Sequence, residues 1–224
     1  MKKKYALNNS YFKNRPYGMP DTILEIAKYK EEYGELPFEY SGDNWVYDAF
    51  CERQKRVGVH NSQFLTPDAT TERMMHFAGK YFNGNDVLEP CCGTGQITKE
   101  LLKDGYNVTA FDIDHDMVSL CKMLYPELNV CQSHFNEMSG VYNQIVANPP
   151  YEIPALTEFL QWVLSVQNKG GISILLLPAG FVDKDRPKAT FETLRKFSLR
   201  ERENMSESFA RTNAKAEIIV LEKL

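Results

Sequence analysis

Short apolar runs alternate with amphipathic stretches from about residue 66 to the last residues of the chain. The apolar runs predict buried strands, and the stretches with an apolar position every third or fourth residue predict helices. The predicted strands lie near residues 86–90, 107–113, 129–133, 144–148, 171–178, 203–209 and 216–221. The predicted helices lie near residues 67–82, 96–104, 115–124, 155–167 and 187–198. Thr66 is placed to cap the first helix, which Pro67 begins.

This order of elements predicts the fold class. Alternation of strands and helices is typical of a parallel sheet that helices cover on both faces. The last two predicted strands form an antiparallel edge. We therefore predict an α/β fold with a doubly wound, mostly parallel seven-stranded sheet and an antiparallel C-terminal hairpin.

The first sixty residues differ from the rest, and we predict a helical N-terminal extension at residues 1–60, before a domain at 61–224. One helix is expected at residues 21–33, and a second near 47–56, with an aromatic-rich loop between them. These aromatic side chains could stack on nucleic-acid bases. They could equally pack the extension onto its domain.

Three polar side chains end predicted strands: Glu89, Asp112 and Asn148. In a parallel sheet the carboxyl ends of the strands meet at one rim, and ligands bind beyond that rim. Asp112 stands at roughly the spacing at which an acidic residue binds a ribose in nucleoside-binding sheets. Asp114 is better explained as the N-cap of the next helix.

A glycine-containing turn, Glu89-Pro-Cys-Cys-Gly-Thr-Gly95, joins the first strand to a helix. Its glycines let a ligand approach the backbone and expose helix N–H groups. It is not the dinucleotide fingerprint, because residues 96–98 are Gln-Ile-Thr and the third glycine is missing. Glu89 could instead attract a cationic group of the ligand.

The four residues Asn148-Pro-Pro-Tyr151 close an apolar strand. Two prolines remove two N–H donors and leave carbonyls that only accept, while Asn148 adds a side-chain carbonyl and Tyr151 an aromatic face. Acceptors beside a flat ring are suited to hold a planar amine while it attacks an electrophile. Taken alone, the same residues also suit a plain turn at the end of a strand.

Together these motifs make the chain resemble the S-adenosylmethionine-dependent amino-methyltransferases, most closely those that act on adenine in DNA, over residues 60–224. Gln63-Phe-Leu-Thr-Pro67 is similar to the family's segment under the methionine part of the cofactor. The resemblance implies a Rossmann-like methyltransferase sheet and S-adenosyl-L-methionine as cofactor. The implied catalytic residues are Asn148, Pro149, Pro150, Tyr151 and Phe209. The implied cofactor-binding residues are Phe64, Thr66, Pro67, Glu89, Pro90, Cys91, Gly93, Gly95, Asp112, Ile113, His134, Phe135 and Asn148.

The resemblance also implies a reaction. Asn148 and the Pro149 carbonyl would accept from the adenine amine while the methyl group arrives, and Tyr151 and Phe209 would sandwich the base. A base in a duplex must be flipped out to reach them. One position departs from the family: His134 stands before Phe135 where an acidic residue usually contacts the cofactor adenine. An imidazole could donate to an adenine acceptor, but it does not reproduce a carboxylate.

Composition sets limits on the partners. Lys and Arg number 26 against 30 Asp and Glu, a net charge of −4, which argues against tight nonspecific DNA binding but allows a local basic face. The expected partner is a nucleic acid, most plausibly DNA. Only about twenty residues separate Tyr151 from the next core strand. Target recognition therefore falls to the N-terminal residues, to a separate specificity subunit, or to a substrate that is already single-stranded.

Two alternatives stay open: methylation of RNA adenine or of a protein glutamine, and a non-catalytic binding subunit with the same fold. The five cysteines lack metal-ligand spacing, so no metal is expected. No apolar run reaches membrane-spanning length and no signal-peptide pattern is present. The sequence thus predicts a cytoplasmic protein without a membrane partner.

Overall fold

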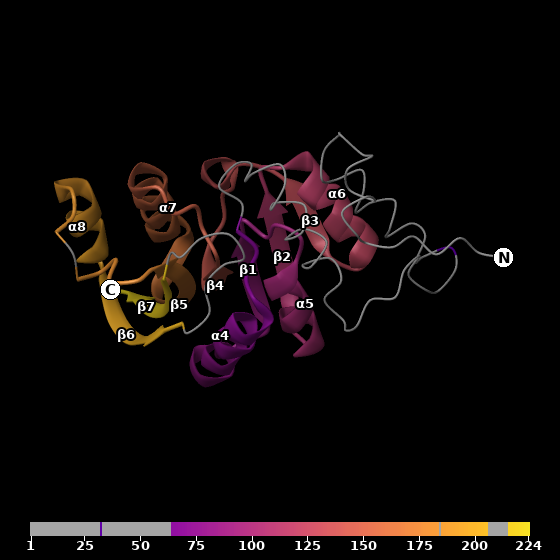
Figure 1. The fold of residues 1–224 in the computed structure, drawn as a ribbon, viewed down its shortest axis with the longest axis horizontal. Helices are drawn as coiled ribbons and strands as arrows, with labels where there is room; N and C mark the ends of the chain where they lie inside the picture. The colour runs from indigo at the N-terminus through magenta and orange to yellow at the C-terminus, as the bar shows by residue number, and fades with distance from the viewer. Residues whose placement is uncertain (1–31, 33–63, 184, 206–214) are drawn as a thin grey trace.

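The computed structural model describes residues 32, 64–183, 185–205 and 215–224 (Figure 1). Apart from residue 32, which is helical, the predicted extension at residues 1–60 lies outside the described residues, and so does Phe209. The predicted boundary between the extension and the domain therefore stays a prediction.

The described chain is built on one seven-stranded sheet with the order β3-β2-β1-β4-β5-β7-β6. Its strands are β1 (Asp86–Pro90), β2 (Asn107–Asp112), β3 (Asn129–Gln132), β4 (Tyr142–Ala147), β5 (Gln167–Pro178), β6 (Phe197–Asn204) and β7 (Ala216–Lys223). The first five strands run parallel, and β7 is antiparallel to both β5 and β6. The predicted fold class, including the antiparallel C-terminal hairpin, is confirmed.

Helices cover both faces of this sheet. They are α4 (Asp68–Tyr81), α5 (Gln96–Lys103), α6 (His115–Leu124), α7 (Ile153–Val166) and α8 (Lys188–Leu194), with a short 3-10 helix, η1 (Phe135–Glu137). Side chains of α4, α5 and α6 belong to one buried cluster, and side chains of α7 and η1 to another. Figure 1 shows α4 and α7 on opposite sides of the sheet.

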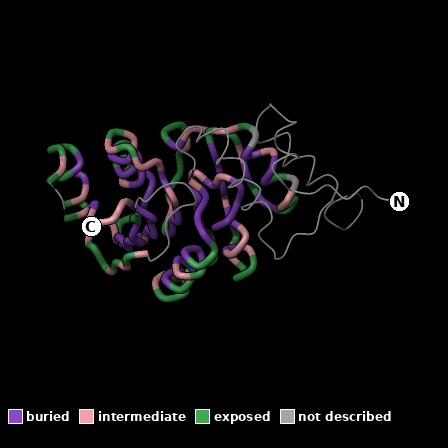
Figure 2. Tube along the Cα trace, viewed as in Figure 1, coloured by how far each residue is buried: buried purple, intermediate pink, exposed green. Residues whose placement is uncertain are grey.

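Alternation along the strands assigns side chains to the two clusters. In β7, Ile218 and Val220 face the α4 side while Ile219 and Leu221 face the α7 side. All four are buried, because a strand in the middle of a covered sheet packs against helices on both faces. Figure 2 shows buried residues in the inner strands and exposed residues on the outer sides of the helices, while the outer strand β6 is mostly exposed or half-buried.

The end of the chain differs from the sequence prediction. The predicted helix at 187–198 stops at Leu194, and the next strand starts at Phe197 rather than near residue 203. Phe197 is buried, and β6 then pairs along its length with β7. The strand was misplaced because it is the outer strand of the sheet and carries mostly polar side chains, so it has no apolar run.

Gln144 of β4 holds the turn between α4 and β1 against the sheet. Its Oε1 accepts from the backbone N–H groups of Asn83 and Gly84, both at 2.8 Å. Its Nε2 donates to the carbonyls of Gly84 and Asp86, both at 2.9 Å. One buried amide thus satisfies four backbone groups of the turn that joins α4 to β1.

Candidate functional site

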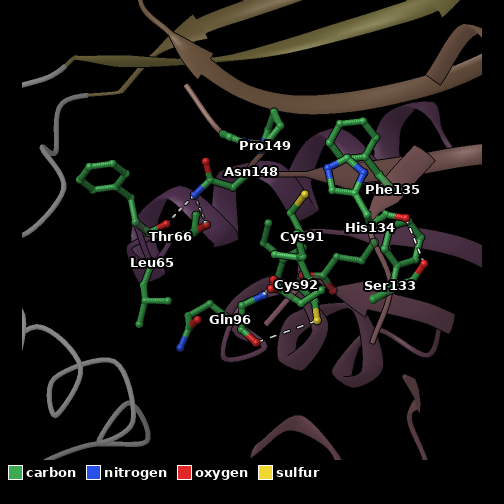
Figure 3. Close-up of a pocket in the computed structure, with 18 residues that line it drawn as sticks. Leu65, Thr66, Cys91, Cys92, Gln96, Ser133, His134, Phe135, Asn148 and Pro149 are labelled. Carbon is green, nitrogen blue, oxygen red and sulfur yellow. Dashed lines mark hydrogen bonds between the residues drawn. The ribbon is translucent and has the colours of Figure 1, made fainter. Parts of the chain in front are cut away.

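A cavity of about 330 Å³ opens at the carboxyl ends of β1, β2 and β4. Residues that follow these strands line it together with the segment before α4, as Figure 3 shows. This is the rim at which a parallel sheet binds its ligands.

Most residues that the sequence nominates line this cavity. They are Phe64, Thr66, Glu89, Cys91, Gly93, Asp112, Ile113, His134, Phe135, Asn148, Pro149 and Pro150. Four nominated residues are not part of the lining, namely Pro67, Pro90, Gly95 and Tyr151. Phe209 lies outside the described residues.

Sequence reasoning missed six residues of the lining. They are Leu65, Cys92, Gln96, Ile97, Phe111 and Ser133. Each is a direct chain neighbour of a nominated residue or begins the helix after the glycine turn. Their positions in the sequence could have indicated them, because the turns that follow parallel strands lie at the same rim of the sheet.

The glycine turn has three residues in the left-handed backbone region: Cys91 at φ 61°, Gly93 at 56° and Gly95 at 84°. Cys91 is the one non-glycine residue with a positive φ in the described chain. A Cβ on Gly95 would lie 2.6 Å from the ring of Tyr125. Gly95 therefore permits close packing of the start of α5 against Tyr125, which follows α6. A different reason for this glycine was expected from the sequence, the approach of a ligand to the backbone.

Two buried thiols support this turn from beneath. The Sγ atoms of Cys92 and Cys121 lie 3.9 and 3.3 Å from the carbonyl oxygen of Gly93. Interaction with Cys121, together with burial, raises the pKa of the Cys92 thiol well above its usual value. Burial raises the pKa of Cys91 in the same way. The side chains of Cys91 and Cys92 are therefore neutral thiols at physiological pH.

Two carboxyl groups with raised pKa values line the cavity, and they differ in their hydrogen-bond donors. Burial raises the pKa of Glu89 to about 8, although a hydrogen bond donated by the Thr98 hydroxyl opposes this shift. Burial also raises the pKa of Asp112, but its oxygens accept from the N–H groups of Gly93 at 2.8 Å and Asp114 at 2.9 Å. Those two donors favour the ionised form of Asp112.

His134 caps η1 and faces the cavity. Its Nδ1 lies 2.6 Å from Oδ1 of Asn136 and 3.3 Å from the Asn136 backbone nitrogen. The amide orientation of Asn136 is set by Nδ2, which donates to Glu158 at 3.0 Å. The two contacts require opposite roles of Nδ1: a proton to donate to Oδ1, and a lone pair to accept from the backbone N–H.

The side-chain amide of Asn148 is anchored by the segment before α4. Its Nδ2 donates to the Phe64 carbonyl at 2.8 Å and to Oγ1 of Thr66 at 3.2 Å (Figure 3). The predicted helix cap is therefore wrong: Pro67 is the N-cap of α4, and no side chain caps it. The Thr66 hydroxyl oxygen accepts from the catalytic candidate instead.

Tyr151 lies beside this anchor rather than in the cavity wall. Its ring stacks on Phe64, with centroids 6.4 Å apart and planes inclined by 28°. Burial raises the pKa of its hydroxyl above the usual value. The predicted stacking of Tyr151 on a target base stays a prediction.

Comparison with known proteins gives this rim a family context. A family described as "Methyltransferase domain" matches residues 87–171, from β1 into β5. The matched range includes Glu89, Asp112 and Asn148.

One curated protein that is similar to this chain is the modification methylase CviBIII of Paramecium bursaria Chlorella virus NC1A. The two are 32% identical over 111 residues, which cover 46% of this chain. The match spans 28% of the relative's length.

Solved structures share the fold of this chain. Protein 1320 of Thermoplasma acidophilum has a TM-score of 0.60 at 18% identity and covers 79% of this chain and 97% of its own. Magnesium protoporphyrin IX methyltransferase from Synechocystis PCC 6803, solved with bound SAH, has a TM-score of 0.58 at 13% identity. That match covers 92% of this chain and 100% of the other.

The cofactor that these comparisons support is S-adenosyl-L-methionine. The cavity fits such a group, because it combines apolar walls at Ile113 and Phe135 with the carboxyl groups of Glu89 and Asp112. Ile113 is 54% exposed, unusually high for a large apolar side chain, and it lies at the cavity.

Among residues 64–183, 185–205 and 215–224, no three His, Cys, Asp or Glu side chains are grouped so that they could hold a metal ion. No helix in the described part of the chain is long and apolar enough to cross a membrane.

Proposed function

We propose that this methyltransferase domain transfers a methyl group from S-adenosyl-L-methionine to the exocyclic amine of adenine in DNA. The observation that carries the proposal is the orientation of Asn148. Both hydrogens of its Nδ2 have an acceptor, in Phe64 and Thr66, so the group that it presents to a substrate is the acceptor Oδ1. Such a site selects a substrate that donates, as an amine does.

The amine of adenine is a poor nucleophile because its lone pair is conjugated with the ring. Asn148 Oδ1 and the Pro149 carbonyl would accept its two N–H bonds and hold the nitrogen with its lone pair directed at the methyl group. When bound, S-adenosyl-L-methionine supplies that methyl group on a sulfonium centre. The contribution of the chain is thus orientation and electrostatic stabilisation.

The cofactor-binding assignments divide by chemistry. Asp112 suits hydroxyl donors such as those of a ribose. Glu89 would suit a cationic group such as an ammonium, whose charge would favour the ionised form of a carboxyl group with a raised pKa. The imidazole of His134 lies at the cavity, where it could donate to an adenine acceptor, as predicted from sequence. Gly93 lines the cavity with its backbone, and Phe64, Thr66 and Ile113 complete the walls.

The assignment to DNA rests on two supports. One is the order of the motifs, and the other is the similarity to a viral modification methylase. Tyr151 and Phe209 would sandwich a flipped base, and a separate subunit would supply target recognition. Because the match covers 28% of that relative, the polymer is the part of the proposal that most needs an experiment.

The decisive experiment follows a labelled methyl group. The protein is incubated with labelled S-adenosyl-L-methionine and duplex DNA, single-stranded DNA, RNA or cell protein, and the products are digested to nucleosides or amino acids. We expect label in methyladenine from DNA. Asn148→Ala should lower the rate by at least about a hundredfold and leave cofactor affinity nearly unchanged. Asn143→Ala, on the exposed part of the same strand, is the matched control.

Other outcomes redirect the proposal. Label in RNA or in protein glutamine would replace DNA as the substrate. Cofactor binding without transfer to any polymer would indicate a missing specificity subunit. Absence of cofactor binding would favour a non-catalytic subunit, and full activity in Asn148→Ala would refute the catalytic assignment.

A further inference from the structure

Thr66 lies between the cofactor cavity and the amide of Asn148. It is 4% exposed and lines the cavity, and its Oγ1 accepts from Nδ2 of Asn148 at 3.2 Å. The two residues are 82 positions apart in sequence. No sequence motif predicts this pair, because the threonine looked like a helix cap.

The position of Thr66 is fixed by α4. The carbonyl of Pro67 accepts from both the backbone N–H and the hydroxyl of Thr71, at 2.9 and 2.8 Å. These bonds hold the first turn of the helix against the residue that follows Thr66. The hydroxyl of Thr66 is therefore presented from a rigid support, as a positioning group requires.

The two acceptors on Nδ2 have different tasks. The Phe64 carbonyl can only accept, so it determines which end of the amide is nitrogen. A second acceptor is needed to fix the rotation of the amide about the preceding bond, and Thr66 provides it. With both bonds formed, the direction of Oδ1 is determined.

The hydroxyl of Thr66 also has a hydrogen of its own. Among the described residues, Oγ1 of Thr66 accepts from Asn148, and no protein acceptor is assigned to its O–H. Because Thr66 lines the cavity, this hydrogen can be donated to a bound ligand. Hydrogen bonds in such a series polarise one another, so a ligand that accepts from Thr66 would strengthen Oδ1 as an acceptor.

We propose that Thr66 is a positioning residue for Asn148, whose hydroxyl directs the amide oxygen toward the methyl acceptor and links that amide to the occupancy of the cofactor cavity. This inference rests on the proposed function of Asn148. It concerns the source of the amide's orientation and is independent of which polymer is methylated.

The kinetic test compares three variants. Thr66→Val removes the hydroxyl with little change in shape, and Thr66→Ser restores it. The control is Thr193→Val, which removes a buried threonine hydroxyl bond to the carbonyl of Ala189 within α8. At saturating cofactor, Thr66→Val should lower kcat about tenfold, the effect of one lost hydrogen bond. Thr66→Ser should recover most of this loss, and Thr193→Val should leave kcat unchanged.

A spectroscopic test does not depend on activity. The side-chain amide protons of Asn148 are assigned by nuclear magnetic resonance from the signals that Asn148→Ala removes. We expect their shifts and exchange rates to change in Thr66→Val, to stay near wild type in Thr66→Ser and Thr193→Val, and to respond to added S-adenosylhomocysteine only where residue 66 has a hydroxyl.

The two tests separate the possible failures. Wild-type kcat in Thr66→Val, or unchanged amide signals, would overturn the positioning role and leave the proposed function intact. Absence of transfer by the wild-type protein would bear on the proposed function, while the amide signals would still decide whether Thr66 directs Asn148.

Discussion

At the scale of single residues, Glu89 is a buried carboxyl group that has no basic partner among the causes of its pKa shift. Its side chain is 1% exposed, and burial raises its pKa from about 4.5 to about 8. Between these pH values the folded protein holds a proton that the unfolded chain releases. Stability from Glu89 is therefore complete below pH 4.5 and is lost as the pH rises through 8.

Replacing Glu89 by Gln should remove this dependence. We expect Glu89→Gln to be more stable than wild type at pH 9 by a few kcal/mol, since one pKa unit corresponds to about 1.4 kcal/mol. The difference should shrink as the pH falls toward 5. Urea denaturation across this range measures it, with Asp86→Asn on the exposed end of the same strand as a control for charge. An equal difference at both pH values would contradict the prediction.

The residue scale also shows what sequence can and cannot predict. Positions at strand ends, such as Asp112 and Asn148, were found because a parallel sheet places them at one rim whatever their side chains contact. The partners of Thr66 and Gly95 were missed. Both depend on contacts with residues that are distant in the chain, Asn148 and Tyr125.

At the scale of elements, the amide of Gln144 joins β4 to the turn between α4 and β1. This turn sets where α4 meets the sheet, and α4 in turn carries the segment that anchors Asn148. A polar residue inside a predicted apolar strand is thus explained by the four backbone groups that it satisfies.

Loss of this amide should be costly. Gln144→Leu would leave two backbone N–H groups and two carbonyls without their partner, and we expect the free energy of unfolding to fall by about 2–4 kcal/mol. Gln144→Glu keeps the acceptor but sets an oxygen that does not donate against the two carbonyls, so it should not restore the lost stability. Asn143→Ala, on the neighbouring exposed position, serves as the control in chemical denaturation. A cost for Gln144→Leu no larger than that of the control would show that water replaces the amide.

Element boundaries were predicted best where burial was greatest. Helix α6 and strand β1 match their predicted ranges, because each has a clear apolar period. The region after Pro187 was predicted poorly, since α8 is short and β6 is a polar outer strand. Its strand character comes from pairing with β7, which local sequence does not encode.

At the scale of the whole molecule, several basic side chains of the described residues have acidic partners. Lys188 pairs with Glu192, Arg200 with Glu222 and Arg202 with Asp183. These three are among the basic residues available for the local basic face that the sequence allows. With acidic partners beside them and a net charge of −4, they attract phosphates weakly.

Nonspecific DNA binding should therefore depend little on salt. We expect the slope of log K against log salt concentration to be shallower than about −3 for duplex DNA, corresponding to three or four neutralised phosphates at most. Fluorescence anisotropy of a labelled duplex at salt concentrations between about 50 and 200 mM measures this slope. A slope of about −6 or steeper would indicate a basic face built by residues outside the described ranges.

The thiols beneath the glycine turn have a practical consequence. A thiol-directed reagent attacks only an accessible thiolate, and Cys92 is buried with a raised pKa. Site-resolved labelling of Cys92 would thus proceed only through rare openings of the turn. The labelling rate of Cys92 therefore reports how often this turn opens. A ligand that occupies the cavity should lower that rate, and no engineered probe is needed to measure it.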